Sequence, residues 1–143
     1  MQHERYVGYE IKALSNLLRR RLWGPADHPQ SMLTEIEGVL IGYLCHSQGR
    51  EIYQKDLERA LCIRSSTASR LLKRLEDEGL VQRSMGVRDA RMKRITPTIR
   101  AQALNQEAER RIAATEATLT RGISQEEIDQ FLAIAEKLKQ NLI

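Results

Sequence analysis

The segment from Leu57 to Thr96 constrains the fold more than any other part of the sequence. Its pattern predicts a short helix, a turn, a second helix with a polar and basic face, and then a small basic hairpin. In that order the elements form a winged helix-turn-helix, which offers one helix to the major groove of DNA and extends the hairpin tip to the neighbouring backbone or minor groove. The expected fold class is therefore mainly α with a small β-hairpin wing (α+β).

Two helices are expected on the amino-terminal side of that segment, because apolar residues recur there at helical spacing. The first should run from about Tyr6 to Leu22 and end at the Gly24-Pro25 break. The second should open with a capping box, in which Thr34 accepts from the backbone three residues on and Glu37 reaches back to the cap. The residues expected to form its buried stripe are Ile36, Val39, Leu40, Tyr43 and Leu44.

The central helix of the segment should begin near Ser65 and present two different faces. Its apolar residues face inward, which leaves the polar and basic residues for the opposite side. Gly79 is expected in the left-handed position just past the helix, so that Leu80 folds back on Leu75 in a Schellman ending. The inward residues are Ala68, Leu71, Leu72 and Leu75.

A long helix should follow the hairpin, with Thr96 as its cap and Pro97 at its first position. Gly122 should end it, and Ser124 with Glu127 forms a second capping box that starts the last helix. Both terminal parts of the chain carry apolar stripes that a compact winged unit does not need. These stripes predict a homodimer. Two DNA-recognition helices related by a two-fold axis would match a palindromic site whose half-site centres lie about 34 Å apart. The alternative is that the terminal helices pack on each other within one chain.

The expected organisation has three parts. Residues 1–30 form an N-terminal dimerisation helix and loop, residues 31–96 the winged helix-turn-helix DNA-binding domain, and residues 97–143 the C-terminal dimerisation helices. No apolar run approaches the roughly 20 residues that cross a membrane, and the first residues lack the apolar core of a signal peptide. A cytoplasmic protein that does not bind membranes is therefore expected.

Positive charge is concentrated on the expected DNA-reading unit. Residues 64–94 hold nine Lys and Arg against four Asp and Glu, a local balance of +5 in a chain whose net formal charge is +4. A clustered basic patch raises phosphate affinity through counterion release, so double-stranded DNA is the expected partner. An ordinary solvated face is the alternative explanation of such a charge run.

The side chains expected to contact DNA come from the central helix and the hairpin. Ser66, Thr67 and Ser69 are short enough to approach phosphates or base edges near the start of a helix. Arg70 can reach a guanine with two hydrogen bonds, whereas Lys73 and Arg74 suit phosphates. The full set is Ser65, Ser66, Thr67, Ser69, Arg70, Lys73, Arg74, Arg88, Asp89, Arg91 and Lys93. For Ser65 the alternative is that it merely caps the helix.

With these residues in view, the chain resembles the MarR-type transcription regulators over nearly its whole length. The most specific matches are residues 65–81, the Asp89-Ala90-Arg91 step and the Arg94-Ile95-Thr96 step into the long helix. The resemblance implies a dimer that binds a pseudo-palindromic operator, usually as a repressor released by a small molecule or an oxidant. It also implies that Asp89 orients an arginine that enters the minor groove, with a simple surface ion pair to Arg88 or Arg91 as the alternative.

Effector binding has fewer signals in the sequence. The family resembled places its ligands between the winged unit and the dimer helices, where Tyr9, Trp23, Tyr43 and Tyr53 could line a crevice; ordinary core packing is the alternative. Oxidation of Cys62 would disturb the helix-turn-helix, although its apolar neighbours favour an inert buried thiol.

The sequence contains no motif of an enzyme, a metal site or a cofactor site. The two cysteines, Cys45 and Cys62, lack metal-ligand spacing, and no Gly-rich phosphate loop or nucleophile elbow occurs. We therefore expect a DNA-binding transcriptional regulator that is not an enzyme and needs no cofactor. A winged-helix protein-interaction module without specific DNA binding is the rival class, and an activator of the same fold is a further one.

Overall fold

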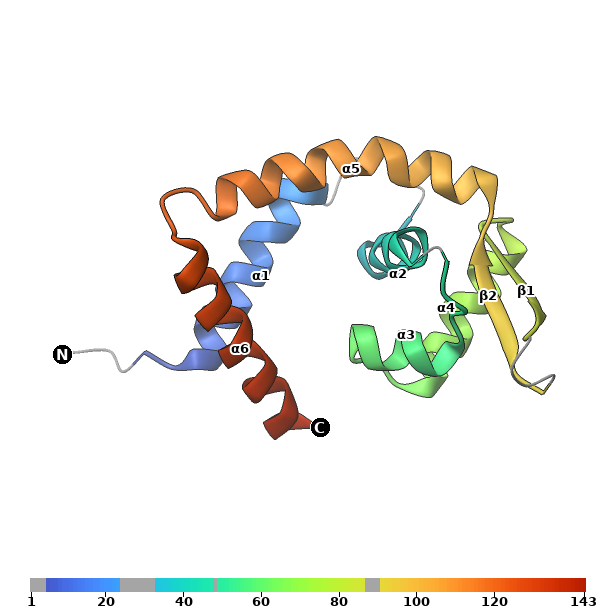
Figure 1. Cartoon of the computed structure of the whole chain (residues 1–143), viewed down its shortest axis with the longest axis horizontal. Coiled ribbons are helices and arrows are strands. Elements are labelled where there is room, and N and C mark those ends of the chain that lie inside the picture. Colours follow the sequence, from blue (N-terminus) through green and yellow to red (C-terminus); the bar gives the residue numbers. More distant parts are fainter. Residues whose placement is uncertain (1–4, 24–32, 48, 87–90) are drawn as a thin grey trace.

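The described residues form a helical protein with one two-stranded antiparallel sheet (Figure 1). The structure is a computed structural model and describes residues 5–23, 33–47, 49–86 and 91–143. In chain order the elements are α1 (Val7–Trp23), α2 (Glu35–His46), α3 (Gln54–Leu61), α4 (Ser65–Asp77), β1 (Val81–Met85), β2 (Lys93–Pro97), α5 (Ile99–Leu119) and α6 (Gln125–Leu142). The expected class, mainly α with a hairpin wing, is confirmed.

The apolar core lies where α2, α3 and α4 meet the hairpin. Leu40 of α2, Leu57 of α3 and Leu72 of α4 are fully buried there. Strand β2 is tied to the segment before α3, because the Ile95 amide donates to the Ile52 carbonyl at 2.8 Å. All four residues expected to face inward on α4 are buried. This core fixes the position of α4 and leaves the opposite face of the helix at the surface.

The beginning of α2 differs in part from the sequence prediction. Thr34 caps the helix as expected, since its Oγ1 accepts from the Glu37 amide at 3.4 Å. The expected return bond from Glu37 is wrong, because the Glu37 carboxylate is buried and directed to α4 instead. Val39 is exposed rather than buried, and Ile41 takes its place in the core. The buried face of α2 is thus rotated from the predicted stripe.

The carboxyl end of α4 is closed by a Schellman motif and tied to α5. Gly79 has a φ of 72°, and the amides of Gly79 and Leu80 donate to the carbonyls of Glu76 and Leu75 at 3.0 and 2.8 Å. The side chains of Thr98 and Arg100 then donate to the carbonyls of Gly79 and Glu78 at 2.8 and 2.7 Å. The end of α4 and the start of α5 therefore form one hydrogen-bonded unit.

The expected start of the long helix at Thr96 is wrong. Thr96 and Pro97 extend β2, where Pro97 lies opposite Val81 in the ladder. Thr98 caps α5 in their place, and its Oγ1 accepts from the Ala101 amide at 3.2 Å. Proline is tolerated at the end of a two-stranded hairpin, so pairing with β1 takes precedence over a helix start at this position.

The long helix α5 connects the two parts of the molecule, with the winged unit at its beginning and α1 and α6 toward its end (Figure 1). Helix α1 contacts α5, whereas α6 has no extensive contact with another described helix or strand. Neither α1 nor α6 contains a buried residue. Their apolar side chains are therefore not covered by each other within the described part of the chain. Among the described residues, every helix is too short or too polar to cross a bilayer.

Candidate nucleic-acid interface

Helix α4 presents a polar and basic face to solvent. Of the residues predicted from the sequence, Ser65, Ser66, Ser69, Arg70, Lys73 and Arg74 are exposed, and Thr67 is half-buried. Arg64, not Ser65, holds the N-cap position, and no side chain caps the helix there. The suggestion that Ser65 merely caps α4 is therefore wrong, and its hydroxyl lies in the first turn of the helix.

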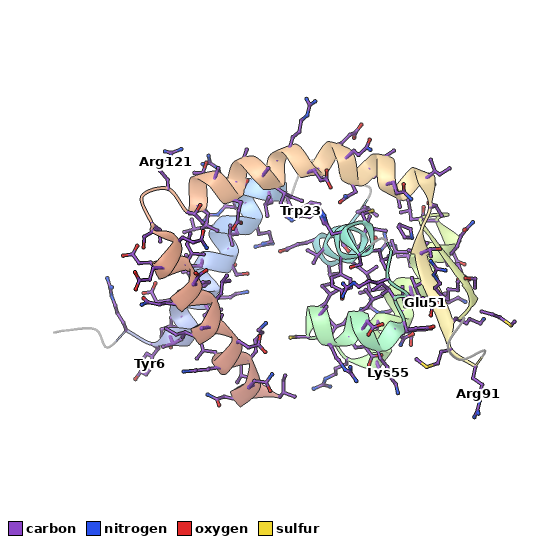
Figure 2. All side chains as sticks on the ribbon, viewed as in Figure 1. Tyr6, Trp23, Glu51, Lys55, Arg91 and Arg121 are labelled. Carbon is purple, nitrogen blue, oxygen red and sulfur yellow. The ribbon has the colours of Figure 1, made fainter. Side chains whose placement is uncertain are left out.

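The described residues at the outer end of the hairpin lie away from the core (Figure 2). Arg91 lies at its outer end (Figure 2), and both Arg91 and Lys93 are exposed. The base of the tip is held by the Gly86 amide, which donates to the Met92 carbonyl at 3.0 Å. A β-carbon at Gly86 would lie 2.5 Å from the Tyr53 hydroxyl oxygen, so only glycine fits without movement of this ring. Two further predicted wing residues, Arg88 and Asp89, lie outside the described residues.

Arg74 differs from the other predicted phosphate contacts because it has a partner inside the protein. Its Nη1 lies 3.0 Å from Oε1 of Glu37, whose side chain is only 2% exposed while that of Arg74 is 53% exposed. The contact is within ion-pair distance, although its angles do not meet those of a hydrogen bond. A buried carboxylate needs such a counter-charge. Arg74 therefore joins α4 to α2, a role that the sequence analysis missed.

Gln54, the first residue of α3, contacts the opposite flank of α4. Its Nε2 donates to Ser69 Oγ at 2.9 Å and to the Ser65 carbonyl at 3.3 Å. Arg74 follows Ser69 by five positions, which places the two side chains about 140° apart around an α-helix. Helix α4 is thus held from two sides, by Gln54 of α3 and by Glu37 of α2.

Two more basic residues near this face were missed by the sequence analysis. Lys55 is exposed at the start of α3 and lies on the same side of the molecule as Arg91 (Figure 2). Arg83 of β1 lies 3.0 Å from Glu76 Oε2 and links the hairpin to α4. A lysine at a helix start gives no distinct signal in a single sequence, and the pairing of Arg83 depends on how the hairpin folds back.

The four aromatic residues predicted to line a ligand crevice do not come together in the chain. Tyr9 is 74% exposed on α1. Its ring packs edge-on against that of Tyr6, with 5.5 Å between the two ring centroids. Trp23 lies between α5 and α2 (Figure 2), with its ring against Gly38. Tyr53 is at the hairpin, where its hydroxyl donates to Glu51 at 2.5 Å. The fourth, Tyr43, packs half-buried against the core.

The two cysteines have different surroundings. Cys62 ends α3 with a φ of 53° and is exposed, so the expectation of a buried thiol at this turn is wrong. Cys45 is half-buried on α2, and burial, together with the negative charge of Glu109, raises the pKa of its thiol. Within the described ranges, no three His, Cys, Asp or Glu side chains form a group that could hold a metal ion.

Comparison with known proteins matches this arrangement to one family. The sequence model of the MarR family matches residues 43–93, which run from α2 through the helix-turn-helix to the start of β2. The transcription regulator MarR from Oenococcus oeni PSU-1 is 27% identical, with a TM-score of 0.84 over 94% of this chain and 99% of that one.

Two solved structures of MepR from S. aureus are also similar. The MepR–DNA complex is 26% identical, with a TM-score of 0.84 over 99% of this chain and 100% of that one. MepR bound to ethidium bromide is 27% identical, with a TM-score of 0.57 over 98% and 99%. The chain therefore has the winged helix-turn-helix fold of these transcription regulators, and its residues 43–93 match the MarR family model.

Proposed function

We propose that this protein is a sequence-specific DNA-binding transcriptional repressor that binds a pseudo-palindromic operator as a homodimer. The observation that carries the proposal is the exposed polar and basic face of α4 beside a hairpin with exposed Arg91 and Lys93. A helix of this kind fits the major groove, and a basic wing fits the adjacent minor groove or backbone. MepR, which has the same fold, has been solved as a complex with DNA.

In this proposal residues 31–96 read DNA, while residues 1–30 and 97–143 hold two protomers together. Support comes from the apolar side chains that α1 and α6 leave exposed, such as Ile11, Leu17 and Phe131, the last of which is 60% exposed. A monomer rarely leaves such apolar helix faces uncovered. A second copy would cover them and would set two α4 helices at the spacing of a palindrome.

The proposal includes release by a small molecule that enters near Trp23, between α1 and the winged unit. MepR has been solved with ethidium bromide, which makes a planar aromatic compound a reasonable first probe. Such a ligand would be expected to change the fluorescence of Trp23, which is the single tryptophan of the chain. Its binding would also raise the thermal midpoint by mass action.

A random-library binding selection with the purified protein tests the DNA-reading part. The expected result is an inverted repeat with half-sites one or two helical turns apart. Equal retention of all duplexes, with weak binding even at low salt, would contradict the proposal and favour a protein-interaction module.

Dimerisation is tested by light scattering on the full chain and on two α6 variants. Phe131→Gln should shift the protein toward monomer and lower operator affinity, whereas Lys137→Gln, which changes an exposed polar residue of the same helix, should remain dimeric. A monomeric wild-type protein would remove the dimer from the proposal.

A further inference from the structure

Gln54 makes a bridge between the two helices of the helix-turn-helix that fixes the orientation of its own amide. The Ser65 carbonyl can only accept a hydrogen bond, so the group 3.3 Å from it must be the amide nitrogen of Gln54. The same nitrogen donates to Ser69 Oγ at 2.9 Å. Both N–H groups of the amide are therefore turned toward α4, and the carbonyl oxygen Oε1 is left as an acceptor.

The Ser69 hydroxyl is oriented by the same bridge. Because its oxygen accepts from Gln54, its own proton points elsewhere and remains able to donate. Ser69 is exposed on the polar face of α4, one turn of helix from Lys73 and adjacent to Arg70. The pair thus offers one acceptor, Gln54 Oε1, and one donor, the Ser69 hydroxyl, from two different helices.

We propose that Gln54 and Ser69 act together as a reader of an A·T base pair in each half-site, an inference that rests on the proposed function. In the major groove adenine presents a donor, N6–H, and an acceptor, N7, which complement this acceptor and donor. Guanine presents two acceptors, O6 and N7, so Gln54 Oε1 would face another oxygen. The bridge also removes side-chain freedom before binding, which lowers the ordering cost of the contact.

Gln54 and Ser69 differ in chemistry from the neighbouring basic residues. Lys55, next to Gln54 on α3, is an exposed positive charge suited to phosphate, and a phosphate contact carries no base preference. A carbonyl oxygen such as Gln54 Oε1 does not attract phosphate. Gln54 is therefore expected to determine sequence preference, whereas Lys55 is expected to determine affinity and salt dependence.

The test compares selected base preferences for the full-length wild-type protein, Gln54→Ala, Gln54→Met, Ser69→Ala and the matched control Lys55→Ala. Gln54→Met retains the length of the side chain but cannot make the bridge. Gln54→Ala, Gln54→Met and Ser69→Ala should each lose preference for adenine at the same symmetry-related position, by about five- to a hundredfold for a contact of this kind. The double variant of Gln54 and Ser69 should lose no more than either single one at that position, because the two side chains act as a unit. Lys55→Ala should retain every base preference and show a smaller dependence of binding on salt.

The outcomes distinguish this inference from the proposed function. Unchanged base preference in the Gln54 variants, or a uniform loss over all duplexes, overturns the composite reader while the DNA-binding function stands. A wild-type protein without preference for any duplex overturns the function and the inference together. Circular dichroism of each variant checks the fold, which should be retained because Ser69 is exposed and Gln54 is outside the core.

Discussion

Arg74 on α4 reaches back to the buried carboxylate of Glu37 on α2, with its Nη1 3.0 Å from Glu37 Oε1. A carboxylate with 2% exposure would be costly to bury alone, so the guanidinium compensates a charge that the core cannot solvate. The contact also sets the position of α4 against α2. A residue on the DNA-reading helix therefore has a structural role, which separates it from its basic neighbours.

Arg74→Ala should destabilise the fold. Removal of one partner of a fully buried pair costs about 3–5 kcal/mol, and the half-exposed Arg74 side chain reduces the expected loss to about 1–2 kcal/mol because water reaches the site. Urea denaturation followed by circular dichroism measures this loss. Lys73→Ala is the matched control and should change stability by less than about 0.5 kcal/mol. Equal stability of the two variants would show that the Glu37 contact contributes nothing.

Arg70 and Lys73 should differ in their effects on DNA binding. Arg70→Ala should relax base preference at one position of each half-site, since a guanidinium can pair with guanine O6 and N7. Lys73→Ala should weaken binding to all sequences and reduce the slope of log affinity against log salt by about 1. Fluorescence anisotropy titrations at several salt concentrations measure both effects. Identical base and salt profiles for the two variants would reject this division.

Removal of the wing charge should weaken operator binding. Arg91→Ala should lower affinity by about 1–3 kcal/mol if its guanidinium enters the minor groove. Asp89, which lies outside the described residues, should give a similar loss on substitution by alanine if it orients that arginine. Gel-shift titration of both variants provides the measurement, and full affinity of either would contradict a wing arginine held by Asp89.

A methyl group at Gly38 should displace the ring of Trp23. A β-carbon there would overlap Trp23 Cη2, so Gly38→Ala requires the ring to leave its place on α2. Trp23 is the single tryptophan, and its emission should shift to the red as water reaches the indole. Gly8→Ala is the control, because nothing lies within 4 Å of a β-carbon at that position of α1. The control should stabilise the protein by about 0.5–1 kcal/mol without a spectral change, and identical spectra for both variants would rule out the Trp23 contact.

The two thiols should react at different rates. Burial and the charge of Glu109 raise the pKa of Cys45, so at pH 8 less thiolate is present at this position than at an ordinary cysteine. Cys62 is exposed and should react with a thiol reagent first. The slower reaction, that of Cys45, should accelerate only as the pH rises above the usual range of thiol pKa values. Glu109→Gln should shift this acceleration to lower pH, because it removes a charge that raises the pKa of Cys45. Equal rates for both thiols in the folded protein would contradict the described burial of Cys45.

The sequence predicted those elements whose signals are local. The apolar spacing of Leu71, Leu72 and Leu75 and the glycine at position 79 defined α4 and its ending, and both are confirmed. The Thr98 cap was missed because proline after threonine usually marks a helix start, whereas here pairing of Pro97 with Val81 continues the strand.

Interactions between distant segments could not be predicted in this way. Glu37 fits a capping box in the sequence, but the fold brings Arg74 to it and the ion pair takes precedence. Gln54 gives no signal at all, because a glutamine at the start of a helix is commonplace. Its contacts with Ser65 and Ser69 arise only when α3 and α4 cross.

The hydrogen bonds from Thr98 and Arg100 to the carbonyls of Gly79 and Glu78 have a mechanical consequence. These bonds join the start of α5 to the end of α4, so we expect the two helices to tilt as one rigid body. In the proposed dimer, a rotation of α5 is therefore expected to move α4 with it.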